Sequence, residues 1–488
     1  MRKSLLLLFM VLVSSVGYTQ YAFHRLYGGD EFDYGYDIVE LPDSGFFVTG
    51  MSGSYTPGHA QAFLMRLDKN GVKQWIVPYG GIENDAGLDL EYKENFGTYL
   101  LGRTTSSNGD FDMWISLLDD QGGVQWERTY PAPDWEEAVE SEMTQDNGLI
   151  VAVHRFGTGT QDQDASLIRL DAQGDTVWVQ EFNVAGNDEI TKIASYQDSL
   201  FVVSSNHLDS VTGKDFALLQ VIHEDGSLLW DDTIGVYPGN SYLNDFYLSG
   251  DTLYGVGASK LDDTSTYNRL RHIHRLSLAE NGDILTDVSI SAGNMIEDVV
   301  ARAHGLGFIY SSFRFQDPMG LSSNYDFYLG LNSLQLTPIG AAANTVTDGE
   351  DLLYEAIPTL DSGTVFVGYQ SLASGGTAVV VMKIGNNIVY PTIPENPLVT
   401  PILGQEENDL LPSVSIYPNP TQGEINIKIE EGTADQFTIV NLEGKVLLSG
   451  GLFGDSTKVD TSSLSKGIYL IQLFNEADFL GAKRIIVD

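Results

Sequence analysis

Residues 67–75 of the chain read LDKNGVKQW, and this phrase sets the period of the first half of the sequence. It returns as LDDQGGVQW at 118–126, as LDAQGDTVW at 170–178, and in a weaker form as IHEDGSLLW at 222–230. The closing tryptophans, Trp75, Trp126, Trp178 and Trp230, are therefore 51, 52 and 52 residues apart. A repeat of this length indicates an array of similar structural units.

Each unit also contains short apolar runs that alternate as half-buried strands do. GFFVTG at 45–50 and GTYLLG at 97–102 are the clearest, and fainter copies at 252–257, 307–310 and 364–368 bring the count to about seven units. Four strand signals in about 50 residues are typical of a β-propeller, whose blades stack radially and cover each other's apolar faces. The sequence therefore predicts an all-β chain with a seven-bladed β-propeller over residues 20–390.

The first unit predicts strands at 36–41, 46–51, 62–67 and 72–77, with an Asp-x-x-Gly turn between the last two. The tryptophan of this outermost strand is expected to pack between neighbouring blades. Residues 21–27 resemble a fourth strand without the preceding three, because LYGG at 26–29 matches PYGG at 78–81. We expect this segment to complete the blade formed by residues 352–390 and so to close the ring.

The repeated phrase, Leu-Asp-x-x-Gly-x-x-x-Trp followed by Tyr-Gly-Gly, resembles the propeller repeats of secreted and surface proteins of bacteria. The resemblance spans residues 21–392 and implies a scaffold rather than an activity. The phrase also partly resembles the tryptophan motif of quinoprotein propellers and the Asp-box of sialidases. In both families that motif is structural, and this sequence has neither the vicinal cysteines of the first nor an arginine cluster on the loop face for the second.

Composition fits a secreted all-β protein. The 488 residues include 51 Gly, 24 Tyr and 22 Phe, which suits short strands joined by tight turns. The formal charge of −41 would repel a phosphate backbone, so nucleic acid is excluded as a partner. The absence of cysteine excludes disulfides, thiolate metal sites and a lipid attached through cysteine.

The first 19 residues predict a signal peptide. Arg2 and Lys3 precede an apolar run at 5–13, which is too short to span a bilayer, since that needs about 20 apolar residues. Small residues place the cleavage after Gly17 or after Thr19. No second hydrophobic segment follows, so the mature protein is expected to pass through the periplasm without a transmembrane segment.

Residues 391–412 predict a linker, because they contain five prolines and the acidic run EEND at 406–409. Proline favours an extended spacer and removes backbone donors, so the linker is expected to stay out of the sheets and to be accessible to a processing protease. Residues 413–488 then form a second, smaller unit.

This last unit opens with YPNPTQG at 417–423 and alternates through Ile425, Ile427 and Ile429. It continues with NLEGKV at 441–446 and LSKGIYLI at 464–471, and it closes with KRIIV at 483–487. In this order the motifs resemble the type A C-terminal sorting domain of the Bacteroidetes type IX secretion system.

The resemblance implies a small Ig-like β-sandwich. It implies further that the outer-membrane translocon recognises this domain, and that the domain is then removed and replaced by a link to surface lipopolysaccharide. It therefore implies a protein that is secreted or displayed at the cell surface, with the secretion machinery as its partner. The residues at the family's motif positions are Pro418, Asn419, Pro420, Gly423, Gly444, Gly467 and Tyr469. The family gives them no catalytic role, and they would form turns and a strand of the sandwich.

The longer and more varied loops are expected on one face of the propeller, where recognition usually occurs. Aligning the units on Tyr-Gly-Gly places an acid at one loop position of this face: Asp33, Asp85, Glu136 and Asp188. Such a ring at the channel mouth would bind a hard cation such as Ca²⁺ or attract a basic ligand. The alternative is that each acid caps a turn of its own blade, which fits the absence of Asp-x-Asp-x-Asp-Gly spacing.

Other chemical signals are weaker. His272 and His274 would share one face of a strand as a zinc pair, but Arg271 and Arg275 beside them favour a packed or solvated pair. An acidic ring is compatible with the carboxylate pair of a glycoside hydrolase, whereas no nucleophile elbow supports a Ser-His-Asp site. The sequence thus favours a binding or structural module, for adhesion or for glycan or protein recognition, over an extracellular polysaccharide-active or other hydrolytic enzyme. No catalytic residue is assigned, and Ca²⁺ is the one cofactor considered.

Overall fold

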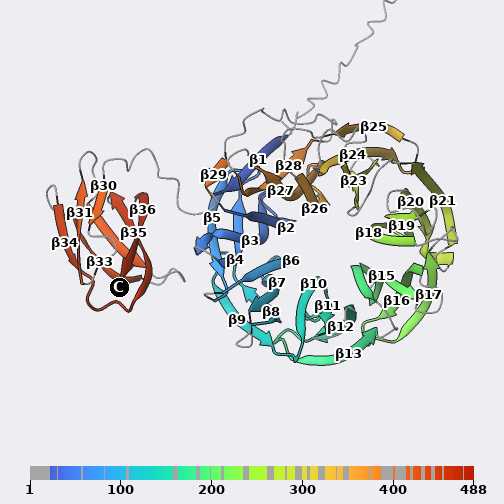
Figure 1. The fold of residues 1–488 in the computed structure, drawn as a ribbon, viewed down its shortest axis with the longest axis horizontal. Coiled ribbons are helices and arrows are strands. Elements are labelled where there is room, and N and C mark those ends of the chain that lie inside the picture. The colour runs from blue at the N-terminus through green and yellow to red at the C-terminus, as the bar shows by residue number, and fades with distance from the viewer. Residues whose placement is uncertain are drawn as a thin grey trace, which may run out of the picture.

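The computed structural model is a ring of β-sheets followed by a smaller β-domain (Figure 1). The predicted signal peptide, residues 1–19, lies outside the residues that the structure describes. These are 22–29, 31–56, 59–81, 83–105, 109–157, 163–182, 187–197, 199–209, 214–234, 241–260, 269–280, 283–291, 299–304, 308–316, 325–336, 338–343, 351–372, 375–385, 399–401, 414–417, 421, 423–429, 435–440, 446–452, 456–475 and 478–487.

Seven sheets form the ring, and each runs from an inner strand at the channel to an outer strand at the rim (Figure 1). Blades 1 to 3 are β2 (Asp33–Glu40), β3 (Phe46–Thr56), β4 (His59–Leu67) and β5 (Lys73–Tyr79); β6 (Asp85–Lys93), β7 (Gly97–Thr105), β8 (Phe111–Leu118) and β9 (Val124–Tyr130); and β10 (Trp135–Met143), β11 (Leu149–Phe156), β12 (Gln163–Leu170) and β13 (Thr176–Phe182).

Blades 4 to 7 continue the same order, which confirms the predicted seven-bladed propeller. They are β14 (Asp188–Tyr196), β15 (Leu200–Asp209), β16 (Lys214–His223) and β17 (Leu228–Ile234); β18 (Ser241–Ser249), β19 (Thr252–Lys260), β20 (Arg269–Ser277) and β21 (Asp283–Ser291); β22 (Val299–His304), β23 (Phe308–Gln316), β24 (Tyr325–Ser333) and β25 (Pro338–Ala343); and β26 (Asp351–Pro358), β27 (Thr364–Ser371), β28 (Thr377–Ile384) and β1 (Phe23–Gly28).

The N-terminal strand closes the ring as predicted. β1 pairs antiparallel with β28, and Tyr27 lies opposite Val379. Behind this pairing, apolar side chains of blade 7 such as Val367 pack with those of blade 1 such as Val48, and both are fully buried. Because one blade is built from both ends of the propeller sequence, the first and last blades cannot separate without breaking a sheet.

The linker contributes one strand, so the expectation that proline keeps it out of the sheets is wrong for three residues. β29 (Val399–Pro401) pairs in parallel with the outer edge of β1, where Leu26 lies opposite Val399. An outer strand leaves a row of unpaired backbone groups, and a short extended segment can cover them. Pro401 stands at the end of β29, where proline is tolerated at a sheet edge.

The repeated Asp-x-x-Gly phrase forms the turn between the third and fourth strands. In blade 1, Asp68 Oδ1 accepts the backbone N–H groups of Asn70 and Val72, each at 2.8 Å. Gly71 has a φ of 73°, in the left-handed region that glycine adopts without steric cost. The aspartate and the glycine recur because the first satisfies backbone donors and the second permits the reversal.

The repeated tryptophan links one blade to the next, as predicted. Trp126 Nε1 donates to the carbonyl oxygen of Ala172 at 3.2 Å, and Trp178 Nε1 donates to that of Glu224 at 3.0 Å. In both pairs the acceptor lies in or beside the turn of the following blade. The indole therefore packs against that turn while its one polar atom is satisfied.

The tyrosine that ends an outer strand, which is part of Tyr-Gly-Gly in blade 1, makes a second link between blades. Tyr79 Oη donates to the carbonyl oxygen of Gly122 at 2.7 Å, and Tyr130 Oη donates to that of Gly174 at 2.7 Å. Each tyrosine ends an outer strand, and each glycine belongs to the Asp-x-x-Gly turn of the next blade. The period of about 50 residues is thus the period of one repeated contact between blades.

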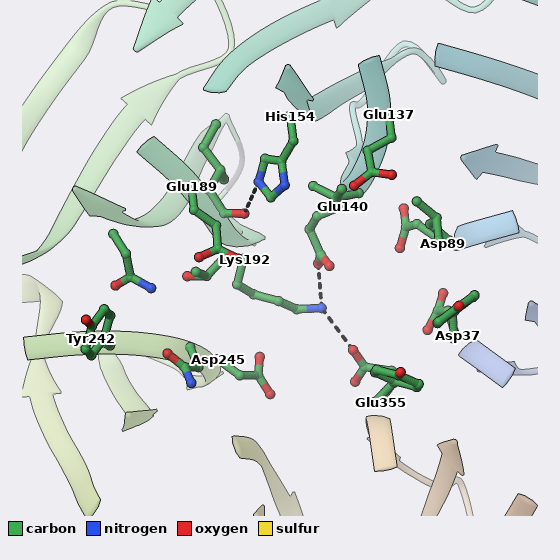
Figure 2. Close-up of a pocket in the computed structure, with 18 of the residues that line it drawn as sticks. Asp37, Asp89, Glu137, Glu140, His154, Glu189, Lys192, Tyr242, Asp245 and Glu355 are labelled. Atoms are coloured by element: carbon green, nitrogen blue, oxygen red, sulfur yellow. Dashed lines mark hydrogen bonds and ion pairs between the residues drawn. The ribbon is translucent and has the colours of Figure 1, made fainter. Parts of the chain in front are cut away.

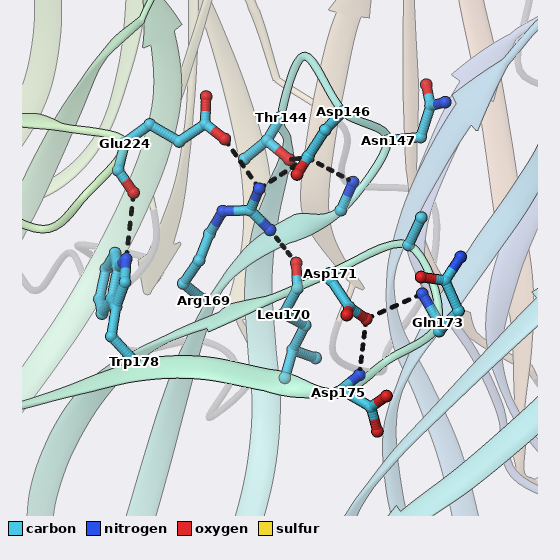
Figure 3. A network of polar contacts seen from close by, with 12 residues as sticks. Thr144, Asp146, Asn147, Arg169, Leu170, Asp171, Gln173, Asp175, Trp178 and Glu224 are labelled. Carbon is cyan, nitrogen blue, oxygen red and sulfur yellow. Dashed lines mark hydrogen bonds and ion pairs between the residues drawn. The ribbon is translucent and has the colours of Figure 1, made fainter.

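On the face of the propeller that carries the Asp-x-x-Gly turns, an arginine pairs with carboxylates of two neighbouring turns (Figure 3). Arg169, which is 4% exposed, places Nη2 2.6 Å from Asp146 Oδ1 and 2.7 Å from Glu224 Oε1. Asp146 is on the turn between β10 and β11, and Glu224 is on a turn of the next blade. This arginine therefore holds two turns together, which is a structural role.

The C-terminal domain is the predicted small β-sandwich. Its two sheets enclose a core in which Ile425, Ile439, Ile471 and Ile485 are fully buried. The strands are β30 (Val414–Tyr417), β31 (Glu424–Ile429) and β34 (Ser456–Asp460) in one sheet, and β33 (Val446–Gly451), β32 (Gln436–Val440), β35 (Gly467–Asn475) and β36 (Asp478–Val487) in the other.

Candidate functional site

Six inner strands share one irregularity at the same point. β2, β6, β10, β14, β18 and β26 each carry a β-bulge, at which one residue is skipped in the pairing with the second strand of the blade. A bulge bends the strand and re-aims the side chains beside it. The residue after the bulge is charged in all six strands, and we call these residues the bulge ring: Asp37, Asp89, Glu140, Lys192, Asp245 and Glu355.

The bulge explains why an acid suits this position. A bulge interrupts the backbone ladder, and the carboxylate accepts the N–H of the residue that follows it. Asp37 Oδ1 accepts from Ile38 at 2.7 Å, and Asp245 Oδ1 accepts from Phe246 at 2.8 Å. Asp37 Oδ2 also accepts the N–H of Leu90 in the next blade at 2.7 Å. The fold thus fixes these oxygens before any ligand arrives.

The bulge ring lines a cavity of about 740 Å³ at the centre of the propeller (Figure 2). Seven carboxyl groups and two permanent cations, Arg103 and Lys192, belong to its described wall, so acidic groups outnumber basic ones there. Tyr36 and Tyr354, the extra residues of two bulges, add aromatic surface, with ring centroids 5.0 Å apart. A cavity of this size and charge could hold a small cationic ligand or the end of a larger one.

Lys192 extends into this cavity from blade 4. Its Nζ lies 2.5 Å from Glu140 Oε1 of blade 3 and 3.3 Å from Glu355 Oε2 of blade 7 (Figure 2). The three side chains are 13 to 16% exposed, so water screens the pairs only partly. One ammonium group therefore joins blades that are not neighbours in the ring.

The carboxyl groups of the cavity are harder to ionise than isolated ones. Burial raises the pKa of Asp37 well above its ordinary value, and the charges of Asp89 and Glu355 raise that pKa further. Burial also raises the pKa of Asp89 to about 6, although a hydrogen bond from the Ser141 hydroxyl opposes the rise. A cation that entered the cavity would lower these pKa values and favour the ionised forms.

His154 adds an imidazole ring to the same wall. The side chain is 7% exposed, and its Nε2 lies 3.1 Å from the carbonyl oxygen of Ile190. A carbonyl oxygen only accepts, so Nε2 must carry the hydrogen, and in the neutral ring Nδ1 is then an acceptor. Figure 2 shows the ring of His154 at the cavity wall, on the same side as Glu140.

The four acids predicted at the channel mouth are the first or second residues of the inner strands, four residues before the bulge ring. Asp33 accepts the N–H of Gly29 at 2.8 Å, and Asp85 accepts the N–H of Gly81 at 2.8 Å. Each also accepts a hydrogen bond from a hydroxyl group of the second strand, from Ser52 for Asp33 and from Thr104 for Asp85. These oxygens are therefore occupied within the wall of the ring.

The other two predicted acids have charged or ionisable partners. Glu136 Oε1 lies 2.6 Å from Arg155 Nε, and Asp188 Oδ1 lies 2.6 Å from His207 Nδ1. Within the described ranges, no group of three or more His, Asp or Glu side chains is arranged to hold a metal ion. The Ca²⁺ site at these four acids stays a prediction.

The remaining predicted residues fall partly outside the description. His274 is 4% exposed, while the side chain of His272 is not among those described, so the zinc pair also stays a prediction. In the C-terminal domain, Tyr469 is buried and donates its hydroxyl group to the carbonyl oxygen of Ser465 at 2.7 Å. Gly423 and Gly467 are described, whereas the other predicted positions lie outside the described residues: Pro418, Asn419, Pro420 and Gly444.

The acids near the start of the inner strands are apparent in the sequence, whereas the bulge ring is not. The signal was present, because a charged residue follows four positions after the first acid in each of several repeats. Asp33 is followed by Asp37, and Asp85 is followed by Asp89. Nothing in strict alternation, however, reveals that a bulge turns this position toward the channel.

Comparisons with known proteins identify one domain of the chain. Residues 415–488 match the family model of the secretion system C-terminal sorting domain. Among curated proteins, none matches the sequence. The Pan2 WD40 domain of Neurospora crassa is 10% identical, with 75% of this chain and 100% of that chain covered and a TM-score of 0.44. A protein of unknown function from Dyadobacter fermentans is 9% identical, with 74% and 97% covered and a TM-score of 0.41.

The match to the sorting domain agrees with the motifs of the last unit and with its observed β-sandwich. Helices of membrane-crossing length and hydrophobicity are not found in the part of the chain that the structure describes. The C-terminal domain is therefore a type IX secretion system sorting domain, and the protein that carries it is secreted or displayed at the cell surface.

Proposed function

We propose that this protein is an extracellular binding module that takes its ligand into the cavity at the centre of the propeller. The observation that carries the proposal is the bulge ring, which places charged side chains of six blades around one cavity of about 740 Å³. Propeller folds commonly serve as rigid scaffolds, and a site built on strands is held more firmly than one built on loops.

The bonding of the carboxylates favours binding over acid–base chemistry. Asp37, Asp245 and Glu355 each accept a backbone N–H from the next residue in the chain. Such oxygens are fixed acceptors, whereas a general acid must hold a proton and direct it at the substrate. Preorganised acceptors increase affinity because little side-chain freedom is lost on binding.

Screening the full-length chain against arrays of glycans, peptides and small extracellular solutes tests this function. Binding that Asp89→Asn weakens, and that Asp231→Asn on the outer strand β17 leaves unchanged, would support a ligand in the cavity. Equal loss in both variants, or binding that survives in both, would contradict it.

A second candidate function is hydrolysis of an extracellular polymer. The observation in its favour is the pair Asp37 and Asp89, which line one cavity and whose pKa values burial raises. A carboxyl group with a raised pKa is suited to donate a proton near neutral pH. Release of reducing sugar from polysaccharides, lost in Asp89→Asn, would establish this function in place of simple binding.

A further inference from the structure

The inference concerns the ligand of the central cavity and rests on the function proposed above. We propose that the cavity binds an alkylammonium group, which is the –NH₃⁺ end of an aliphatic amine. A free diamine and a lysine side chain both carry this group.

The wall of the cavity offers far more acceptors than donors. Carboxylates from six blades reach it, and ionised carboxylates have acceptor sites only. An –NH₃⁺ group has three donors and no acceptor, so it complements such a wall. The two permanent cations of the described wall are already engaged: Arg103 pairs with Glu137, and Lys192 pairs with Glu140 and Glu355.

His154 offers a further hydrogen-bond acceptor to a ligand in the cavity, because Nδ1 is an acceptor in the neutral ring. Its side chain is nine-tenths buried and its Nε2 is committed to the carbonyl oxygen of Ile190. Within the described part of the chain, no hydrogen bond reaches its Nδ1, and the residue lines the cavity. Nδ1 is not among the buried side-chain atoms that lack a partner, so a ligand or water in the cavity can reach it and donate to it.

Lys192 shows that the bulge ring accommodates an ammonium group. Its Nζ is held between Glu140 and Glu355, at 2.5 and 3.3 Å. Asp37 and Asp89 occupy the equivalent positions of the next two blades beyond Glu355 and line the same cavity. A second ammonium group beside these two aspartates would repeat the arrangement.

The tyrosines suit the rest of such a ligand. Tyr36 and Tyr354 line the cavity next to Asp37 and Glu355, and their rings lie 5.0 Å apart. Aromatic faces attract ammonium groups and pack against methylene chains. This combination favours an aliphatic amine over a bare metal ion, which would gain nothing from the rings.

Calorimetry with the full-length chain tests the proposal with 1,5-diaminopentane as the probe. Its neutral isostere 1,5-pentanediol and Ca²⁺ are the controls for charge and for cation type, and a lysine-containing peptide with its norleucine counterpart tests the second source. We expect the diamine or the lysine peptide to bind, and the diol and the norleucine peptide not to bind. Affinity should fall about tenfold or more in Asp89→Asn and Asp245→Asn, and it should not change in Asp231→Asn.

The outcomes separate this proposal from the one on which it rests. Equal binding of diamine and diol, or a loss as large in Asp231→Asn as in the cavity variants, overturns the alkylammonium proposal. Binding of Ca²⁺ in preference to the amines overturns it as well. If a glycan binds in a manner that depends on Asp89 while the amines do not bind, the binding function stands and the ligand assignment falls. Circular dichroism of each variant verifies that a lost signal does not reflect unfolding.

Discussion

Lys192 Nζ lies 3.3 Å from Glu355 Oε2, although the two residues belong to blades 4 and 7 and are 163 positions apart in the sequence. The same ammonium group lies 2.5 Å from Glu140 of blade 3. Propeller blades otherwise contact mainly their neighbours, as Tyr79 and Gly122 do. The ion pairs of Lys192 therefore give the ring a connection through its centre.

Substitution of Lys192 should destabilise the propeller at neutral pH. In Lys192→Met, Glu140 and Glu355 lose a shared counter-ion within a crowd of carboxylates, and we expect the free energy of unfolding to fall by about 2–4 kcal/mol. Urea unfolding at pH 7.5 measures the change. Lys192→Arg, which keeps the charge, should lose much less, and equal stability of Lys192→Met and wild type would refute the role of this cation.

The raised pKa of Asp89 gives stability a defined dependence on pH. The folded-state pKa of about 6 exceeds the ordinary value of 3.8, so this group's contribution is complete below pH 4 and is lost as the pH rises through about 6. Relative to wild type, Asp89→Asn should therefore gain on the order of 2 kcal/mol between pH 4 and pH 8. Urea unfolding of both proteins at pH 4, 6 and 8 checks this, and parallel curves would contradict it.

The tyrosine links between blades should contribute additively. Tyr79→Phe removes a buried hydrogen bond to a turn glycine and Tyr130→Phe removes a half-buried one, each at a cost of about 1 kcal/mol. The two contacts belong to different blade interfaces, so the double variant should lose about the sum. Thermal melting of the three variants measures this. If the double variant is no less stable than either single variant, the hydroxyl groups do not contribute to stability additively.

The repeated aspartate should matter through its carboxylate oxygen. Asp171 Oδ1 accepts the N–H groups of Gln173 and Asp175, at 2.9 and 2.8 Å. Asp171→Ala leaves both donors without this acceptor and should cost about 1–2 kcal/mol, whereas Asp171→Asn keeps the oxygen and should cost less. Chemical denaturation ranks the two variants, and the reverse order would reject this account of the turn.

Loss of the last strand should block delivery to the cell surface. Residues 483–487 belong to β36, which pairs with β35 and places Ile485 in the core of the sorting domain. A chain lacking residues 483–488 is expected to remain in the periplasm, as detected by cell fractionation and by protection from added protease. Lys458→Ala, on an exposed position of the same domain, serves as the control, and normal surface display of the truncated chain would disprove the claim.

The fold could be predicted from the sequence because short stretches of sequence specify its turns and strands. An aspartate and a glycine three residues apart make one turn by themselves, as Asp68 and Gly71 do, and the tryptophan that follows marks the outer strand. This signal occurs in the first four blades, the fourth in a weaker form, and short apolar runs mark the other three. The closing strand could be predicted for the same reason, since LYGG at 26–29 copies a phrase of known place in the repeat.

The site was less predictable because it depends on pairing between strands. A bulge is set by register, and register decides that Asp37 lies at the cavity while Asp33 binds Ser52 inside the wall. The acids at the start of the inner strands also have different partners in different blades. Asp85 accepts from the hydroxyl of Thr104, whereas Glu136 pairs with the guanidinium of Arg155. Identical positions in the sequence repeat therefore differ in their chemistry.

The shared seventh blade also determines how the ring would carry a mechanical load. A pull on the C-terminal side enters through β29, whose residues run parallel to β1, and through β28, which lies between β27 and β1. Several hydrogen bonds along these strands would have to shear together before the chain could extend. A protein displayed at a cell surface would thus meet tension at the blade where both ends of its propeller are already bound to each other.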